Sequence, residues 1–315
     1  MGSRKGDPLD GLLLLDKPLG ITSNRALQIA KRLLGAAKAG HTGSLDPQAS
    51  GMLPLCFGEA TKFSRFYLEA DKAYQATISL GSNTSTGDSE GEIISTAPVP
   101  SVTEAAFTNF LQQFTGELSQ IPPMYSALKH QGQPLYKLAR AGKSIERAPR
   151  LVKIHLLRLD RIHERLQNSA QSEGGPILLD ISVICSTGTY IRTLAEDIGN
   201  AWGGGAHLAA LRRLWVSPFE KHAMVSLETL ESLNEAERRA YLYTIPAILA
   251  PILPTVSLTE AAVFCLLRGQ AVPLPSPMPP GWVSLMSESG VFLGVGEVQA
   301  SGDVVAPRRL VQVLR

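Results

Sequence analysis

The stretch from Gly40 to Gly51 concentrates residue types that can do chemistry. It reads GHTGSLDPQASG and holds an imidazole, His41, and a carboxylate, Asp46, among three glycines. Glycine permits backbone conformations with positive φ, and an Asp-Pro pair favours a turn, so such a loop can aim both side chains at one point. Simpler explanations exist, because an aspartate before a proline is most often a turn residue and a histidine can hydrogen-bond within its own loop.

Two other segments supply aromatic rings and a cation. The sequence KAYQATISL alternates apolar and polar positions, which predicts a strand over Ala73–Leu80 with Tyr74 at its start. Near the middle of the chain, GTYIRTL supplies Tyr190 and Arg192 at the beginning of a helix predicted over Thr189–Ile198. A carboxylate, an arginine and aromatic rings can act on a planar ring, although each residue taken alone fits an ordinary packing or ion-pair role.

Length and composition limit the class of protein. A chain of 315 residues with 44% hydrophobic content predicts about two domains with sizeable cores and excludes global disorder. The three cysteines lie far apart without a CxxC pair, which argues against a disulfide framework or a zinc site. The apolar run Leu12–Leu15 is too short to span a bilayer. These features predict a soluble, cytoplasmic protein with no membrane association.

Basic residues gather in one segment, although the formal net charge of the chain is only +2. Between Lys129 and Arg165 there are ten Lys and Arg residues against three Asp and Glu residues. Clustered positive charge is what a polyanion-binding surface needs, and a solvated basic face is the alternative. Glycines and prolines between Gly132 and Pro149 predict that this segment is a mobile loop with a short helix inside it.

Five blocks in order along the chain resemble the signature of the bacterial, stand-alone TruB-type tRNA pseudouridine synthases. They are LLLLDKPLGITSN, GHTGSLDPQASGMLPLCFGEATKFSRFY with KAYQATISLG, IPPMYSALKHQGQPLYKLARAG, CSTGTYIRTLAEDIG, and GGGAHLAALRRLWVSPF, which together span about residues 11–220. The remainder of the chain matches the family more loosely. The resemblance implies an isomerase that converts uridine 55 in the T loop of tRNA to pseudouridine by base flipping and glycosidic bond exchange.

The resemblance assigns the chemistry to three residues. It implies that Asp46 is the nucleophile, an established role for carboxylates. Arg192 is expected to form an ion pair with Asp46 and to oppose the rise in the carboxyl pKa that a dry pocket causes. Tyr74 is expected to stack on the flipped base, which recovers part of the flipping cost of a few kcal/mol, and its hydroxyl is a candidate for handling the proton lost from C5.

Other residues match positions that bind the substrate in the family. Tyr190 and Leu211 are expected to line the pocket, although Leu211 fits the core of a helix almost as well. His41 is expected to help displace the base, and Asp88 matches a further acidic position with a supporting role. Lys17 and the following proline are expected to brace the loop that carries Asp46.

The resemblance also implies the fold. It is an α+β pseudouridine synthase fold with a central mixed, mainly antiparallel sheet flanked by helices, followed by a small β-rich PUA-like domain. We place the catalytic domain at 1–250, with an RNA-binding insertion at about 124–152, and the PUA-like RNA-binding domain at 251–315. Local patterns predict a helix over Ser23–Leu34 capped by Ser23 or Asn24, a polar hairpin tip at 166–175, and a last strand at 310–313. The insertion residues expected to contact tRNA are Lys137, Arg140, Lys143 and Arg147.

Pseudouridylation changes no oxidation state, so neither a cofactor nor a metal ion is expected. The expected partner is the T arm of tRNA, without a guide RNA, and the family implies a monomer. Two alternatives stay open. One is an RNA-guided synthase similar to dyskerin, which shares the aspartate loop. The other is a tRNA-folding chaperone in which catalysis is incidental.

Overall fold

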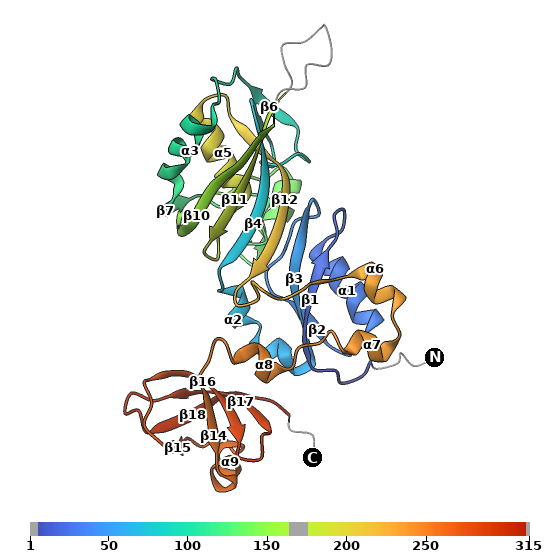
Figure 1. Ribbon diagram of the computed structural model, residues 1–315, viewed down its shortest axis with the longest axis vertical. Coiled ribbons are helices and arrows are strands. Elements are labelled where there is room, and N and C mark those ends of the chain that lie inside the picture. The colour runs from blue at the N-terminus through green and yellow to red at the C-terminus, as the bar shows by residue number, and fades with distance from the viewer. Residues whose placement is uncertain (1–5, 164–175, 313–315) are drawn as a thin grey trace.

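Two β-sheets organise the chain, as the ribbon in Figure 1 shows. The computed structural model describes residues 6–163 and 176–312. A nine-stranded mixed sheet spans most of the chain, and a five-stranded sheet follows at the C-terminal end. Helices lie against the large sheet, so the predicted α+β architecture with a C-terminal β-rich part is confirmed.

The large sheet has the strand order β13-β1-β3-β12-β4-β11-β10-β7, with β2 paired to β3. Its strands are β1 (Gly11–Lys17), β2 (Ala39–His41), β3 (Ala49–Phe57), β4 (Lys72–Leu80), β7 (Gly116–Gln120), β10 (Arg150–His163), β11 (Ile177–Cys185), β12 (Ala206–Val216) and β13 (Val225–Ser226). The pairs β1–β13 and β3–β12 are parallel, and the other pairs are antiparallel. The parallel β3–β12 pair brings the segment after Asp46 beside the segment around Leu211.

Helices cover the two halves of the large sheet separately (Figure 1). The helices α1 (Ser23–Leu33) and α6 (Leu227–Ser232) pack with β1 and β3, whereas α3 (Glu104–Leu111) and α5 (Ile191–Trp202) pack with β4, β10 and β11. On β11 every second side chain is buried against these helices, as the sequence ILLDISVIC requires. The remaining elements before residue 250 are α2 (Arg65–Leu68), α4 (Leu135–Arg140), α7 (Glu235–Arg239), α8 (Ile245–Leu249), the 3-10 helices Gly58–Phe63 and Gln112–Phe114, and the hairpins β5 (Ser82–Thr84) with β6 (Ile93–Thr96) and β8 (Lys129–His130) with β9 (Gln133–Pro134).

The C-terminal sheet has the order β14-β16-β17-β18-β15 and carries one helix. Its elements are β14 (Thr255–Leu258), α9 (Glu260–Leu266), β15 (Val272–Pro273), β16 (Gly281–Ser287), β17 (Phe292–Val298) and β18 (Val304–Leu310). The sheet docks on the 3-10 helix after β3, where the rings of Phe63 and Phe292 lie 5.7 Å apart and Lys62 Nζ donates a hydrogen bond of 2.9 Å to the Leu310 carbonyl. A common apolar cluster therefore joins the two sheets.

Three sequence predictions need correction. The basic segment is not a single loop, because Arg150–His163 forms β10, in which buried Val152, Ile154 and Leu157 point into the core between outward basic residues. The N-cap of α1 is Thr22, since the Ser23 hydroxyl is engaged elsewhere. The last strand is β18, which ends at Leu310. The predicted hairpin tip at 166–175 lies outside the described residues.

Candidate active site

The loop that carries Asp46 is fixed from two sides. The buried Ser23 hydroxyl, at the start of α1, donates to the Leu45 carbonyl at 3.0 Å and accepts from the Leu45 amide at 2.8 Å. On the other side, the Lys17 ammonium donates to the carbonyls of Pro18 at 2.8 Å and Pro47 at 3.5 Å. The residues immediately before and after Asp46 are therefore both anchored. Lys17 braces this loop, as the sequence predicts.

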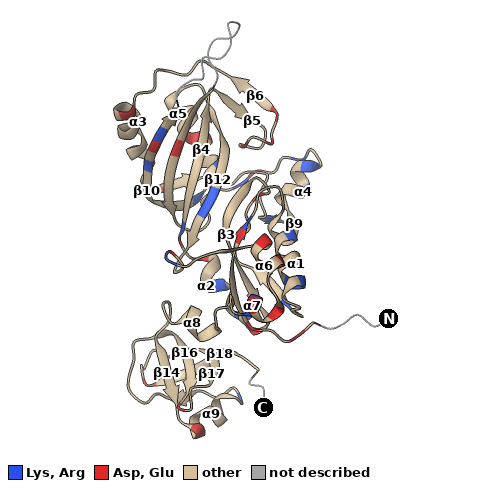
Figure 2. Cartoon of the chain, turned by 45° about the vertical axis from the view of Figure 1, so that its right-hand side comes forward, with Lys and Arg blue, Asp and Glu red and all other residues tan. Residues whose placement is uncertain are grey.

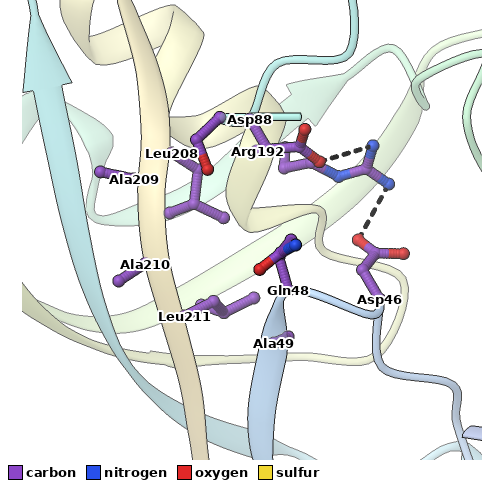
Figure 3. A pocket seen from close by; sticks show the side chains of 10 residues that line it. Asp46, Gln48, Ala49, Asp88, Arg192, Leu208, Ala209, Ala210 and Leu211 are labelled. Carbon is purple, nitrogen blue, oxygen red and sulfur yellow. Dashed lines mark ion pairs between the residues drawn. The ribbon is translucent and has the colours of Figure 1, made fainter. Parts of the chain in front are cut away.

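A single arginine joins two carboxylates in the site (Figure 3). Arg192, in the first turn of α5, places Nη2 at 3.1 Å from Asp46 Oδ2 and Nη1 at 3.6 Å from Asp88 Oδ2. The same guanidinium donates to the carbonyls of Tyr125 at 2.6 Å and Thr86 at 3.1 Å. Its side chain is only 7% exposed, so these acceptors fix its orientation.

Asp88 is held by its own loop as well as by Arg192. Its carboxylate accepts hydrogen bonds from the Thr86 hydroxyl and, at 3.1 Å, from the Glu90 amide. The loop is joined to β12 by two backbone hydrogen bonds, Leu208 N to Gly87 O and Ser89 N to Leu208 O. Asp88 is thus a buried, fully engaged carboxylate that supports Arg192, while the Asp46 side chain remains 47% exposed.

The surroundings of Asp46 favour its protonated form more than water does. Partial burial raises the pKa of Asp46, the Arg192 guanidinium lowers it, and the carboxylates of Asp88 and Glu90 raise it again. Because nearly half of the side chain is open to solvent, hydration limits this rise. Arg192 is accordingly the main group that keeps Asp46 ionised.

A pocket opens beside these charges (Figure 3). It is lined by Asp46, Gln48, Ala49, Asp88, Ser89, Arg192, Leu208, Ala209, Ala210 and Leu211. One side is charged and the opposite side is apolar, an arrangement that suits a flat polar ring. Leu211 contributes from β12 and pairs with Ala49 of β3, so the helix-core interpretation of this leucine is wrong.

Neither Tyr74 nor His41 lines this pocket. Tyr74 is 8% exposed and packs within the main hydrophobic core, where burial raises the pKa of its hydroxyl and Arg213 opposes the rise. His41 ends β2, and burial together with Arg213 lowers its pKa, so the ring is neutral near pH 7. Among the described residues, its Nδ1 atom has no hydrogen-bond partner.

Tyr190, at the N-cap position of α5, lies close to the Arg192 and Asp46 charges, but it is not among the residues that line the pocket, where the sequence led us to expect it. Its amide donates to the side chain of Gln120 at 3.0 Å, and that side chain donates back to the Tyr190 carbonyl at 3.3 Å. Burial raises the pKa of Tyr190, while Ser126 and Arg192 lower it. The beginning of the insertion, around Tyr125 and Ser126, is therefore in contact with the site.

The basic residues of the insertion lie elsewhere. Lys137 and Arg140 belong to the last turn of α4 and are exposed, and Lys143 and Arg147 follow in the connection to β10. Figure 2 shows basic residues on α4 and on β10 as separate groups. The structure does not bring these four side chains into the pocket.

Sequence reasoning overlooked Arg213. It lies two residues after Leu211 on β12, so both side chains point to the same face of the sheet. Arg213 is 1% exposed and donates to the carbonyls of Met52 at 2.6 Å and Gly43 at 3.1 Å. No pattern along LAALRRL marks it as buried, and its pairing partners in β3 and β4 show which face of the sheet it occupies.

Two negative findings concern the described part of the chain alone. Residues 6–163 and 176–312 contain no cluster of three or more His, Cys, Asp or Glu side chains placed to hold a metal ion. No helix in those ranges is both long and apolar enough to cross a bilayer.

The fold and this site define a class of protein. The chain superposes on a chain of a Cbf5–Nop10–Gar1 complex with a TM-score of 0.65 and 26% identity, over 95% of this chain and 84% of the other. An archaeal box H/ACA sRNP Nop10–Cbf5 complex shows the same fold, with a TM-score of 0.66 at 24% identity over 98% of this chain and 92% of the other. The model of the TruB family pseudouridylate synthase N-terminal domain matches residues 31–191.

Two TruB C-terminal models match the chain from residue 192 to residue 311. The tRNA pseudouridylate synthase B C-terminal domain matches 192–255, and the pseudouridine synthase II TruB C-terminal model matches 254–311. The tRNA pseudouridine synthase B of Methylobacillus flagellatus is 51% identical over 304 residues, which are 96% of each chain. That of Chromohalobacter salexigens is 48% identical, over 98% of this chain and 96% of its own. The chain belongs to the TruB family of pseudouridylate synthases.

Proposed function

We propose that this chain isomerises uridine 55 in the T loop of tRNA to pseudouridine. The observation that carries the proposal is the Asp46–Arg192–Asp88 array beside a pocket with one charged and one apolar side. Further support comes from the relatives named tRNA pseudouridine synthase B, which match almost the full length of the chain. The reaction breaks the bond from C1′ to N1, forms the bond from C1′ to C5, and replaces the C5 proton by one on N1.

In this proposal Asp46 carries the bond exchange and Arg192 keeps its carboxylate ionised and oriented. Asp88 in turn holds Arg192, which is already bound to two carbonyls. Tyr74 stacks on the flipped uracil and offers its hydroxyl near C5. Tyr74 is only 8% exposed before substrate binds, so the side chains that cover its ring must move when the base enters. Stacking on the ring then offsets part of the cost of flipping the base, which is a few kcal/mol.

Three further residues complete the proposed substrate site. Leu211 provides part of the apolar wall, and Tyr190, at the start of α5, lies within reach of the Asp46 and Arg192 charges without lining the pocket. His41, with a neutral ring, helps to separate the base from its tertiary pairing.

We divide the chain into a catalytic domain at 1–250 and a PUA-like RNA-binding domain at 251–315. Support for this division is that the second sheet begins at Thr255 and that two family models meet at residues 254–255. The insertion at about 124–152 contributes Tyr125 and Ser126 to the site and places its basic residues outside it. These basic residues, together with the C-terminal domain, would contact the tRNA backbone, which would make a guide RNA unnecessary. We propose also that the enzyme works in the cytoplasm as a monomer.

The test is conversion of an unmodified tRNA transcript by the purified chain alone, with a transcript carrying cytidine at position 55 as the matched control. Stoichiometric pseudouridine in the first transcript and none in the second is the expected result. Product at another uridine would refute the assignment of position 55.

A guide-dependent activity is the second candidate, because the fold matches the Cbf5 chain of the Cbf5–Nop10–Gar1 complex at 26% identity. The same assay separates the two functions. Absence of product until a guide RNA and protein partners are added would favour the guided enzyme.

A further inference from the structure

Arg213 stands out because its buried charge has no carboxylate partner within the described residues. It is the largest of the fully buried side chains, and its hydrogen bonds go to the backbone carbonyls of Met52 and Gly43. Two lysines close by, Lys17 and Lys72, are also buried. Burial lowers the pKa of each to about 8, the Arg213 charge adds to the shift, and the Asp46 carboxylate opposes it at Lys17. Retaining a guanidinium among other cations is unfavourable, so stability alone does not explain this residue.

The register of the sheet places Arg213 at the junction of two functional elements. On one side it is the cross-strand partner of Tyr74 in β4, and on the other side it is the partner of Gly51 in β3. Paired residues on neighbouring strands project to the same face, so the side chains of Arg213 and Tyr74 share that face, and the guanidinium opposes the rise in the pKa of the Tyr74 hydroxyl. Gly51 is required there, since a Cβ atom would lie 2.1 Å from the Arg213 carbonyl oxygen.

The other end of the guanidinium reaches the Asp46 loop. Nη2 donates to the Gly43 carbonyl at 3.1 Å, and Gly43 precedes Asp46 by three residues. Nε is held by the Met52 carbonyl at 2.6 Å, so the planar group cannot rotate without breaking both bonds. One rigid group thus links the loop of the proposed nucleophile to the hydroxyl of the proposed stacking ring.

We propose that Arg213 is a positioning residue that fixes the Tyr74 hydroxyl relative to the Asp46 loop for the isomerisation. This inference rests on the proposed function. It assigns Arg213 no contact with the substrate. Its effect is therefore expected in kcat and not in tRNA affinity, and it acts through the hydroxyl of Tyr74.

The test is a double-mutant cycle with Arg213→Met, Tyr74→Phe and the double variant, measured as single-turnover rates and tRNA dissociation constants. Phenylalanine keeps the stacking ring and removes only the hydroxyl. Arg213→Met is expected to lower the rate about 100-fold, the size of a 1 Å misplacement, with tRNA affinity unchanged. Adding Arg213→Met to the Tyr74→Phe protein should change the single-turnover rate by no more than about twofold.

Arg212→Met is the matched control, because Arg212 is the adjacent arginine and pairs instead with Asp16 at 2.7 Å. It should leave the rate unchanged. Arg213→Lys keeps the positive charge but cannot donate to both carbonyls at once. It serves as the test variant if Arg213→Met does not fold, and its loss of rate should depend on the Tyr74 hydroxyl in the same way. Independent, multiplicative losses in the cycle would overturn the inference, as would an Arg213 effect on affinity alone. An inactive wild-type protein would instead refute the proposed function.

Discussion

Replacing Arg192 by methionine removes the group that keeps Asp46 ionised. The structure gives the size of the effect, because one charged contact to Asp46, at 3.1 Å, is lost from the reacting carboxylate. A hydrogen bond to a charged group contributes about 1.5–3 kcal/mol, and 1.36 kcal/mol corresponds to tenfold in rate. We therefore expect kcat/KM to fall roughly 10- to 150-fold. The half-exposed position of Asp46 favours the lower part of this range.

The pH profile gives a more specific signature than the rate. The guanidinium lowers the pKa of Asp46 against the rise caused by burial, Asp88 and Glu90, so its removal raises that pKa further. The carboxylate then stays protonated to a higher pH, and the acidic limb of kcat/KM against pH moves upward. Arg192→Lys, which keeps a charge but cannot reach all four acceptors, should move the limb less.

The assay is initial-rate conversion of a tRNA transcript over a pH series, with thermal unfolding of each variant at every pH. Thermal unfolding excludes the trivial explanation that Asp88, left with only Thr86 and Glu90 as donors, destabilises the protein. An acidic limb that stays in place in a folded Arg192→Met protein would refute the electrostatic role of Arg192.

Three other predictions test the surroundings of the site. Gly51→Ala should lower the midpoint of thermal unfolding and the activity, because φ is +101° and the new Cβ would lie 2.1 Å from the Arg213 carbonyl oxygen. In the control, Gly116→Ala, φ is +98° but the new Cβ meets open space, so the midpoint should fall less. The pKa of Lys17 is about 8 in the folded protein and about 10.5 in the unfolded chain, so the free energy of unfolding of the wild type should increase as the pH rises from 8 to 10.5. The Lys17→Met protein should lack this increase when both proteins are compared in denaturation series over that pH range. Neutralising four insertion charges should weaken tRNA binding and flatten its salt dependence by about 0.7–0.9 per lost phosphate contact, and an unchanged slope in titrations would exclude those contacts. The four residues are Lys137, Arg140, Lys143 and Arg147.

Much of the site was predictable because its residues lie in short, ordered sequence blocks. The turn composition around Asp46 and the strand beginning near Tyr74 both correspond to observed elements. The ion pair of Asp46 with Arg192 followed from the family resemblance alone, since no local pattern relates residues 146 positions apart.

The errors arose where tertiary pairing decides the structure. Leu211 fits a helical pattern locally, yet pairing with Ala49 and Ala76 makes its segment a strand. Ser23 is a good N-cap by composition, but its hydroxyl binds the backbone of Leu45 instead. Arg213 was missed because a fully buried arginine has no signature in composition, and only the register of β12 shows which face it occupies.

The most direct test of the central claim is the Asp46→Asn protein. Asparagine keeps the size of the side chain and an oxygen that can face Arg192, and it removes the carboxylate that carries the bond exchange. Single-turnover conversion of a tRNA transcript should show no pseudouridine, while the dissociation constant for the same transcript stays close to that of the wild type. Pseudouridine formed by a homogeneous Asp46→Asn preparation would contradict the account.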